Sequence, residues 1–338
     1  MADKIRAGVI GMGQMGQLRR RLLAAHPDFE VVASCDREPK ALTLGPEEAF
    51  HTDYRQVLDA PTDAVFVCTT NDASAAVAAA ALDAGKHVFC EKPPGRSLAE
   101  VRRIADAERR NPRLKLKFGF NHRYHESVRD ALAIAQSERL GRLLWMRGLY
   151  GKSGGPGFER SWRNDRQRSG GGILLDQGIH MLDLFRLFGG EFEEVKSLVG
   201  TLHWPIDVED NAFVLLRSRG GTVAMLHSSS TQWKHLFALD LFFVAGYITI
   251  NGILSSSQSY GRETLVIGRR EPEDAKAPGA PREEMSYYTQ DVSWRLELDE
   301  FADAILHDRA VTVGTSQDAL RVMELVEAAY HDDTRGTR

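Results

Sequence analysis

The chain has 338 residues, of which 43% are hydrophobic and 27% are charged, and its formal net charge is −4. This length exceeds what one hydrophobic core usually fills, so we expect two domains, and the slightly acidic balance argues against a nucleic-acid-binding surface. The N-terminus lacks the pattern of a signal peptide and no run of about 18 apolar residues follows, so we expect a cytoplasmic protein without a membrane anchor. The three cysteines, Cys35, Cys68 and Cys90, have no CxxC spacing. They predict neither a disulfide framework nor a zinc site, and small buried thiols are the favoured interpretation.

Residues 1–122 alternate short apolar runs with helical segments. Strands are expected at 4–11, 29–36, 63–70 and 86–90, and helices at 16–26 and 73–84. Strands that alternate with helices are typical of βαβ units. The fold class expected for this region is α/β, a Rossmann domain with a doubly wound parallel sheet.

A glycine-rich turn follows the first expected strand. Gly11, Gly13 and Gly16 form G-x-G-x-x-G between a strand and a helix, and Asp36 follows 20 positions later, at the end of the second strand. In this context the first glycine permits a tight turn, the second lets a pyrophosphate approach, and the third allows close helix packing. Asp36 would bind the ribose hydroxyls of NAD and disfavour NADP, although the neighbouring Arg37 leaves NADP possible. The expected contacts with the cofactor in this region come from Gly11, Met12, Gly13, Gln14, Met15, Gly16, Asp36 and Arg37.

The pattern changes after residue 122. Apolar runs at 143–151, 195–204, 211–218, 222–233 and 237–252 follow one another in meander-like order, with Gly220 and Gly221 as a hairpin turn between two of them. This predicts an open antiparallel sheet in a second, α+β domain of residues 123–338. The terminal segment 294–330 predicts two amphipathic helices, which could pack back on the first domain. The polar segment 270–284 predicts an exposed loop.

The segment GGGILLDQGIH, residues 170–180, places Asp176 and His180 four residues apart. On a helix both side chains would share one face with Asp183, opposite an apolar stripe. A solvated polar face is one interpretation. Gly178 favours a second, because a glycine inside a helix costs about 1 kcal/mol and suggests close approach by a cofactor or substrate.

The segment AGKHVFCEKP, residues 84–93, makes the pattern specific. Together with the glycine turn and the later G-G-G-x-x-x-D-x-x-x-H, it resembles the glucose-fructose oxidoreductase, inositol dehydrogenase and MocA family over nearly the whole chain. The resemblance implies that Lys92, Asp176 and His180 form the catalytic group. It also implies a second domain with a large antiparallel sheet that often serves as an oligomer interface, so we expect a homodimer or homotetramer.

Further candidates are weaker. Thr69, Thr70 and Asn71 follow a strand and resemble a family loop near the cofactor, although a helix N-cap explains them equally well. Glu91, Lys92 and Asn121 are also expected near the cofactor. Arg123, Trp162 and Arg163 are candidates for substrate binding. Asp207, Glu209 and Asp210 form an acidic patch without a histidine at ligand spacing, so we expect no metal site.

The implied reaction is hydride transfer between a secondary alcohol or ketone of a sugar, polyol or sugar derivative and a nicotinamide, NAD or NADP. His180 would take the hydroxyl proton, Lys92 would stabilise the developing alkoxide, and Asp176 would orient the imidazole or a substrate hydroxyl. Two alternatives remain open: an NAD-dependent glycoside hydrolase that acts by transient oxidation and elimination, and a non-catalytic sensor of a dinucleotide or sugar. Retention of all three residues argues against the sensor.

Overall fold

The computed structural model describes residues 4–38, 43–255, 258–271, 279 and 281–333, and the chain divides into two compact units. The first unit comprises Met1–Asn121, Gln167–Gly170 and Trp294–Met323, and the second comprises His122–Arg166, Gly171–Ser293 and Glu324–Arg338. The boundary expected after residue 122 lies one residue from this division. Much of the terminal helical segment belongs to the first unit.

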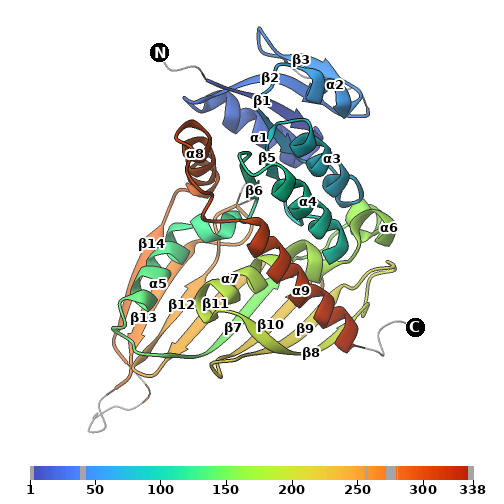
Figure 1. Cartoon of the computed structure of the whole chain (residues 1–338). Helices are drawn as coiled ribbons and strands as arrows, with labels where there is room; N and C mark the ends of the chain where they lie inside the picture. The colour runs from blue at the N-terminus through green and yellow to red at the C-terminus, as the bar shows by residue number, and fades with distance from the viewer. Residues whose placement is uncertain (1–3, 39–42, 256–257, 272–278, 280, 334–338) are drawn as a thin grey trace. The chain divides into compact units, whose positions relative to one another are not determined.

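The first unit is built on a parallel six-stranded sheet in the order β3-β2-β1-β4-β5-β6, as the alternating pattern predicts (Figure 1). Its strands are β1 (Ile5–Ile10), β2 (Phe29–Cys35), β3 (Ala49–His51), β4 (Ala64–Val67), β5 (His87–Cys90) and β6 (Leu116–Phe118). Its helices include α1 (Gln14–Ala25), α2 (Tyr54–Asp59), α3 (Asn71–Asp83) and α4 (Leu98–Arg110). Helix α8 (Ser293–Leu306) also belongs to this unit, apart from its first residue. Helix α9 (Ser316–Asp332) begins in this unit and ends in the second one. The doubly wound parallel sheet is confirmed.

The core of this unit joins segments from both ends of the chain. Leu23 of α1 and Phe301 of α8 are fully buried with Ala7 and Val9 of β1. Burial of each such large side chain contributes about 1.5–3 kcal/mol. Helix α8, from the C-terminal part of the chain, is therefore part of the hydrophobic core of the first unit.

The second unit is built on an eight-stranded sheet in the order β14-β13-β12-β11-β7-β10-β9-β8. Its strands are β7 (Leu143–Gly151), β8 (Phe192–Gly200), β9 (Asn211–Ser218), β10 (Val223–Ser229), β11 (Leu236–Phe243), β12 (Gly246–Asn251), β13 (Glu263–Arg269) and β14 (Glu283–Tyr288). The large, mainly antiparallel sheet is confirmed, but the meander-like order is wrong at one place. Strand β7 inserts between β10 and β11 and runs parallel to β10. Because β7 and β10 are far apart in the chain, no local turn signals their pairing.

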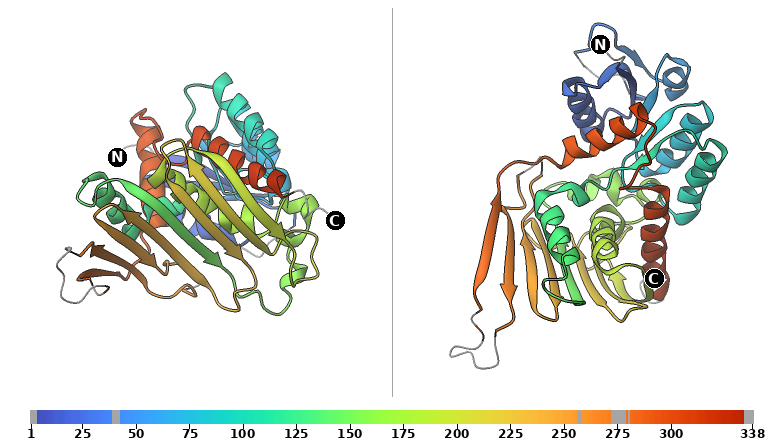
Figure 2. Two further views of the ribbon diagram at one scale, coloured as in Figure 1. Left: turned by 90° about the horizontal axis from the view of Figure 1, so that it is seen from below. Right: turned by 60° about the vertical axis from the view of Figure 1, so that its left-hand side comes forward.

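One face of this sheet carries helices and the other does not (Figure 2). Helix α7 (Ile179–Gly189) packs on β7 and β10, and α5 (Glu126–Gln136) packs on β12 and β13. The opposite face exposes apolar side chains on neighbouring strands. We call the set of Trp145, Phe213, Leu215, Val223 and Met225 the open apolar face; each is 38–50% exposed.

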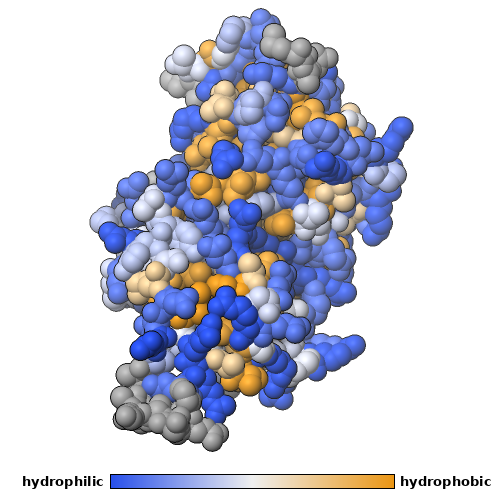
Figure 3. Space-filling view, turned by 90° about the vertical axis from the view of Figure 1, so that its left-hand side faces the viewer, coloured by the Kyte–Doolittle hydropathy of each residue, from blue (hydrophilic) through white to orange (hydrophobic). Residues whose placement is uncertain are grey.

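The expected hairpin between β9 and β10 is confirmed, because the amide N–H of Gly221 donates to the carbonyl oxygen of Ser218 at its turn. The expected loop at 270–284 lies largely outside the described residues, although its end forms the start of β14. From the side shown in Figure 3, apolar side chains form separate patches among hydrophilic ones. Among the described residues, none of the helices combines the length and apolar character that a bilayer crossing requires.

Candidate active site

The glycine turn of the first unit has a separate structural reason for each glycine. Gly11 has φ +93°, and a Cβ there would lie 2.6 Å from the carbonyl oxygen of Cys68. A Cβ on Gly16 would lie 1.7 Å from the carbonyl oxygen of Gly11, whereas a Cβ on Gly13 would meet no atom within 4 Å. Gly11 and Gly16 therefore close the turn against neighbouring backbone, and Gly13 leaves open space at the start of α1. A helix N-terminus with open space before it is the geometry that binds a pyrophosphate.

Asp36 lies directly after β2 and contacts this turn. Its Oδ2 accepts the amide N–H of Met12 at 2.8 Å, and its Oδ1 accepts the amide N–H of Glu38 at 3.1 Å. The side chain of Met12 is fully buried in the core. Met12 thus fixes the turn through its backbone and side chain together, and Asp36 holds the turn while remaining partly exposed. The exposed Arg37 follows it.

The segment Thr69, Thr70 and Asn71 begins α3 after β4. Thr70 occupies the N-cap position, and the Asn71 side-chain amide donates to the carbonyl oxygen of Ser169 at 2.8 Å. Asn71 therefore holds the segment Gln167–Gly170 to the first unit, and the cofactor contacts expected of the three residues stay predictions.

The E-K-P turn follows β5, and its glutamate lies in a buried ion cluster. The guanidinium of Arg19 on α1 is fully buried and donates to Glu91 and to Glu297 on α8, each at 2.6 Å. Burial raises the pKa of Glu297, while the charges of Arg19 and Lys117 oppose that rise. Because removal of one partner would leave a buried charge unpaired, this cluster holds the turn firmly in place. Lys92 follows Glu91, is half-buried, and precedes a cis peptide bond to Pro93.

The three cysteines lie at the ends of strands: Cys35 and Cys90 are the last residues of β2 and β5, and Cys68 directly follows β4. All three are free and buried. Burial raises the pKa of Cys35 to about 11 and raises the pKa of Cys68 and of Cys90 further. They are unreactive packing residues, as expected.

The segment with Asp176 and His180 is not one uniform helix. A π-helix, η4 (Leu174–Gly178), precedes α7. His180 is 4% exposed and Asp183 is 1% exposed, so the alternative interpretation of a solvated polar face is wrong for these two residues. Helix α7 lies between the sheet and other segments of this unit and is buried on all sides. Short π-helical turns occur often at functional sites.

The glycines of this segment pack against protein. A Cβ on Gly172 would lie 2.0 Å from the carbonyl oxygen of Glu209, and one on Gly178 would lie 3.4 Å from Ser228 on β10. The carboxylate of Glu209 accepts the amide N–H groups of Gly172 and Leu174 at 2.8 and 3.0 Å. Glu209 therefore caps this helical segment. Gly178 packs against Leu174 and Ser228, and the close approach of a ligand there stays a prediction. The described residues hold no cluster of His, Cys, Asp and Glu suited to a metal ion.

Asp176 is held between two cations of the same unit. The ammonium of Lys152, which follows β7, pairs with its Oδ2, and Nε of Arg163 lies 3.5 Å from its Oδ1. The guanidinium of Arg163 also lies 4.6 Å from the ring centre of Trp162. These groups are partly exposed, so they form a polar surface with one excess positive charge that can bind hydroxyl or anionic groups.

His180 lies in a buried aromatic cluster. Its ring stacks on that of His122 with centroids 3.8 Å apart and an angle of 20° between the planes. A hydrogen bond of 3.0 Å joins Nε2 of His122 to the hydroxyl of Tyr150, and burial raises the pKa of Tyr150 well above its ordinary value. Residues from 3₁₀-helix η1 (Asn121–Tyr124), β7 and α7 therefore meet around the imidazole of His180.

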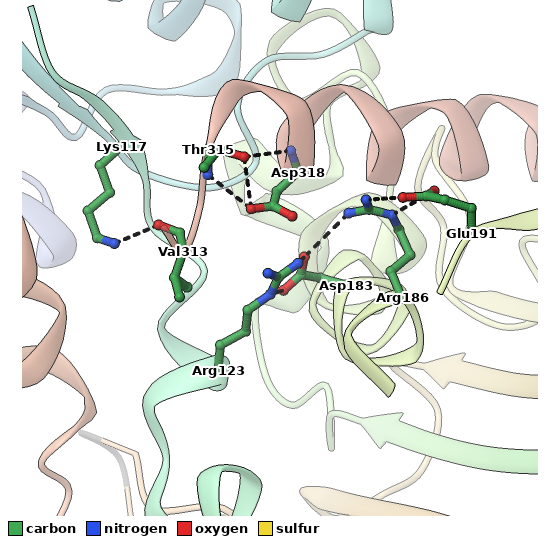
Figure 4. A network of polar contacts seen from close by, with 8 residues as sticks. All are labelled: Lys117, Arg123, Asp183, Arg186, Glu191, Val313, Thr315 and Asp318. Carbon is green, nitrogen blue, oxygen red and sulfur yellow. Dashed lines mark hydrogen bonds and ion pairs between the residues drawn. The ribbon is translucent and has the colours of Figure 1, made fainter. Parts of the chain in front are cut away.

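Arg123, a candidate for substrate binding, forms an ion pair with Asp183 in this structure, and its contact with substrate stays a prediction. Its guanidinium donates to both carboxylate oxygens of Asp183 on α7, at 2.7 and 2.5 Å, and Arg186 of the same helix pairs with Glu191 (Figure 4). The same view shows Lys117 of the first unit donating to the carbonyl oxygen of Val313. The planar two-point contact fixes 3₁₀-helix η1 (Asn121–Tyr124), which carries His122, onto α7.

Sequence reasoning missed Lys152, His122 and Tyr150. Lys152 is 24 residues from Asp176, and His122 is 28 residues from Tyr150. Within the segment Asn121–Tyr124, the sequence predicts roles for Asn121 and Arg123 only. A histidine between these two residues is the sequence feature that could have indicated His122 as well.

Comparisons with known proteins agree with these two units. Residues 5–119 match the model of an oxidoreductase family with an NAD-binding Rossmann fold, and residues 128–249 match the GFO/IDH/MocA C-terminal domain. Myo-inositol 2-dehydrogenase of Thermotoga maritima is 30% identical over 239 residues, which cover 67% of this chain and 68% of that protein. The chain belongs to the GFO/IDH/MocA family. It is therefore an NAD-binding oxidoreductase of the dehydrogenase type.

Other family members are similar at lower identity. Levoglucosan dehydrogenase of Pseudarthrobacter phenanthrenivorans is 28% identical over 268 residues, 67% of this chain and 68% of that protein. A structure of levoglucosan dehydrogenase in complex with NADH has a TM-score of 0.84 at 21% identity and covers 99% of this chain and 98% of that one. This likeness shows the shared fold.

Proposed function

We propose that the protein oxidises a secondary alcohol of a sugar, polyol or sugar derivative with NAD, or reduces the corresponding ketone. The observation that carries the proposal is the buried His180, stacked on His122 and four residues after Asp176, whose side chain is 16% exposed. A buried imidazole next to polar groups that can orient a hydroxyl is the arrangement that general-base catalysis requires. Relatives named for levoglucosan and inositol support the substrate class.

The first unit fits a dinucleotide. The open space at Gly13 and the N-terminus of α1 would hold the pyrophosphate, and Asp36 would accept hydrogen bonds from the adenosine ribose. When bound, NAD supplies the hydride acceptor. Because the Asp36 carboxylate would repel a 2′-phosphate, NAD is the preferred cofactor over NADP.

His180 accepts the proton of the reacting hydroxyl. An imidazole exchanges protons near neutral pH, which suits it to this role. Burial keeps water away from the imidazole, so the accepted proton stays on its ring until the site opens to solvent.

Lys92 stabilises the alkoxide that develops as the proton leaves. Its ammonium donates a hydrogen bond to the alkoxide oxygen, and its positive charge attracts the negative charge on that oxygen. Asp176, held by Lys152 and Arg163, accepts a hydrogen bond from a neighbouring substrate hydroxyl. A fixed carboxylate orients the ring without taking part in proton transfer.

The experiment is a panel of sugars, polyols and glycosides assayed with NAD and with NADP by the absorbance of the reduced nicotinamide. Oxidation of at least one secondary alcohol with net release of NADH supports the proposal. Cleavage of a glycoside with no net NADH would instead support the hydrolase, and binding of sugars without any turnover would support a sensor.

A further inference from the structure

An aromatic platform lies on three loops of the second unit, outside the polar site around Asp176. It consists of Phe158, His203, Trp204 and Trp233, and Phe158 and Trp204 have ring centres 5.0 Å apart. His203 meets Trp204 and Trp233 edge-on at 5.1 and 4.9 Å. The loops follow β7, β8 and β10, so residues far apart in the chain build one surface.

The platform is held rigidly but remains open. The amide N–H groups of His203 and Trp204 donate to the carboxylate of Asp210 at 2.8 and 2.9 Å, and Nε1 of Trp204 donates to the carbonyl oxygen of Ser230 at 3.1 Å. A Cβ on Gly154 would lie 2.2 Å from the indole of Trp204, so the glycine makes room for that ring. These contacts fix the orientation of Trp204 before any ligand binds.

Trp233 lies largely in solvent. It is 61% exposed and its backbone has φ +56°, a conformation that a bulky residue rarely adopts. Such backbone strain persists where the surrounding structure imposes it, and it gathers at ligand sites. Here the positive φ holds a large aromatic side chain that is mostly exposed and contacts the ring of His203.

The platform is continuous with the polar site. Gly154 lies two residues after Lys152, whose carbonyl oxygen accepts the amide N–H of Gln232 at 3.2 Å, next to Trp233. In the other direction, the ring of His235 meets that of Tyr260 at 4.9 Å, and the Tyr260 hydroxyl accepts a hydrogen bond of 2.6 Å from Gln177. Gln177 is the neighbour of Asp176. The same loops thus carry both the platform and the polar groups of the candidate site.

We propose that this platform is a second sugar subsite, so that the substrate is a glycoside or oligosaccharide with one ring at Asp176 and the next ring on Trp233 and Trp204. The proposal rests on the proposed function for the first ring. The apolar C–H face of a pyranose packs on flat aromatic rings, and polar neighbours such as Gln232 and Lys234 can reach its hydroxyls. A sugar matches this mixture of exposed rings and polar side chains better than an apolar protein surface, which would leave those polar groups unpaired.

The test compares a methyl glycoside with the disaccharide that has the same reacting ring. Trp233→Gly removes the ring and tolerates the positive φ, whereas Trp233→Tyr keeps an aromatic face. We expect Trp233→Gly to lower kcat/KM for the disaccharide about tenfold, with little change for the methyl glycoside. Trp233→Tyr should restore most of the loss. Tyr287→Ala, which removes an aromatic side chain that is 57% exposed on β14, is the matched control and should change neither substrate.

A binding measurement separates this inference from the proposed function. Titration of the wild type and of Trp233→Gly with disaccharides, in the presence of NADH, requires no turnover. Binding that weakens about tenfold in Trp233→Gly, together with no oxidation of any sugar in the separate panel with NAD and NADP, would support the subsite and contradict the dehydrogenase. Equal kcat/KM values for both substrates in the wild type and Trp233→Gly, or equal losses for both, would overturn the subsite. A change in sedimentation of Trp233→Gly would also overturn it, because the platform would then be a contact between copies of the chain.

Discussion

The glycine turn of the first unit and the His180 cluster of the second unit are built in different ways. The turn depends on backbone: Gly11 and Gly16 have no space for a side chain, and the start of α1 supplies N–H groups. The cluster depends on side chains from η1, β7 and α7 that meet in a buried interior. Cofactor binding and proton transfer therefore depend on separate features of the molecule. A substitution in the glycine turn should change cofactor binding alone, and a substitution in the His180 cluster should change turnover alone.

The largest effect is expected at Lys92, where a substitution should change turnover and leave cofactor binding nearly unchanged. Lys92→Met removes the positive charge that stabilises the alkoxide, so kcat should fall by about 10²-fold or more. The Kd for NADH, measured by fluorescence titration, should change little. Lys196→Met on β8 removes an exposed lysine paired with Asp332 and should leave kcat unchanged. A Lys92→Met enzyme with normal turnover on a confirmed substrate would remove Lys92 from the mechanism.

The open apolar face should mediate assembly. A homodimer or homotetramer would cover Trp145, Phe213, Leu215, Val223 and Met225, which share one face of neighbouring strands. Met225→Glu would bury an unpaired charge and should weaken association about 10²-fold. Sedimentation should then show the 37.7 kDa monomer at concentrations where the wild type is assembled. Leu306→Glu, on the partly exposed end of α8, is the control, and a monomeric wild type would contradict the prediction.

Asp36 is expected to set the choice of cofactor. Asp36→Ser removes a carboxylate that binds the ribose and repels a 2′-phosphate, so the preference for NAD should fall about tenfold. Comparison of Kd values for NADH and NADPH measures this ratio, and kcat at saturating cofactor should be preserved. Tighter binding of NADPH than of NADH by the unmodified protein would be the contrary result.

The smallest effect is expected at Tyr150. Tyr150→Phe removes the hydroxyl that bonds Nε2 of His122 and should reduce kcat a few-fold by loosening the stacked pair. The pH at which kcat is half-maximal should shift, because the charge state of His122 affects that of His180. A lower melting temperature with an unchanged pH profile would show that Tyr150 only supports packing.

The sequence predicts those parts of the molecule that depend on local backbone chemistry. The parallel sheet, the glycine turn and the hairpin at Gly220 and Gly221 all follow from neighbouring residues, and each is present. Asp176 and His180 were found as a spaced pair. The burial of His180 was not predicted, because a stretch of helix can face solvent or a second layer of protein with the same local pattern.

Long-range partners lie beyond such reasoning. Arg19 meets Glu297 across 278 residues, and nothing near either residue signals the pair. The same holds for β7, whose place between β10 and β11 is decided by packing across the whole sheet. In the sequence, Trp233 is only the last residue of an expected strand. Its aromatic neighbours come from other loops, and no local pattern predicts that these loops lie together.

The most direct test of the separation between cofactor binding and proton transfer is to measure NADH affinity and turnover in His180→Ala and Gly16→Val side by side. We expect His180→Ala to lower kcat by about 10²-fold or more and to keep the affinity for NADH. This variant should regain part of its activity at high pH, because hydroxide replaces the missing base. Gly16→Val should lose NADH affinity, because its side chain would collide with the carbonyl oxygen of Gly11. Near-normal turnover in His180→Ala on a confirmed substrate would contradict the account and leave His180 as a packing residue of a buried helix.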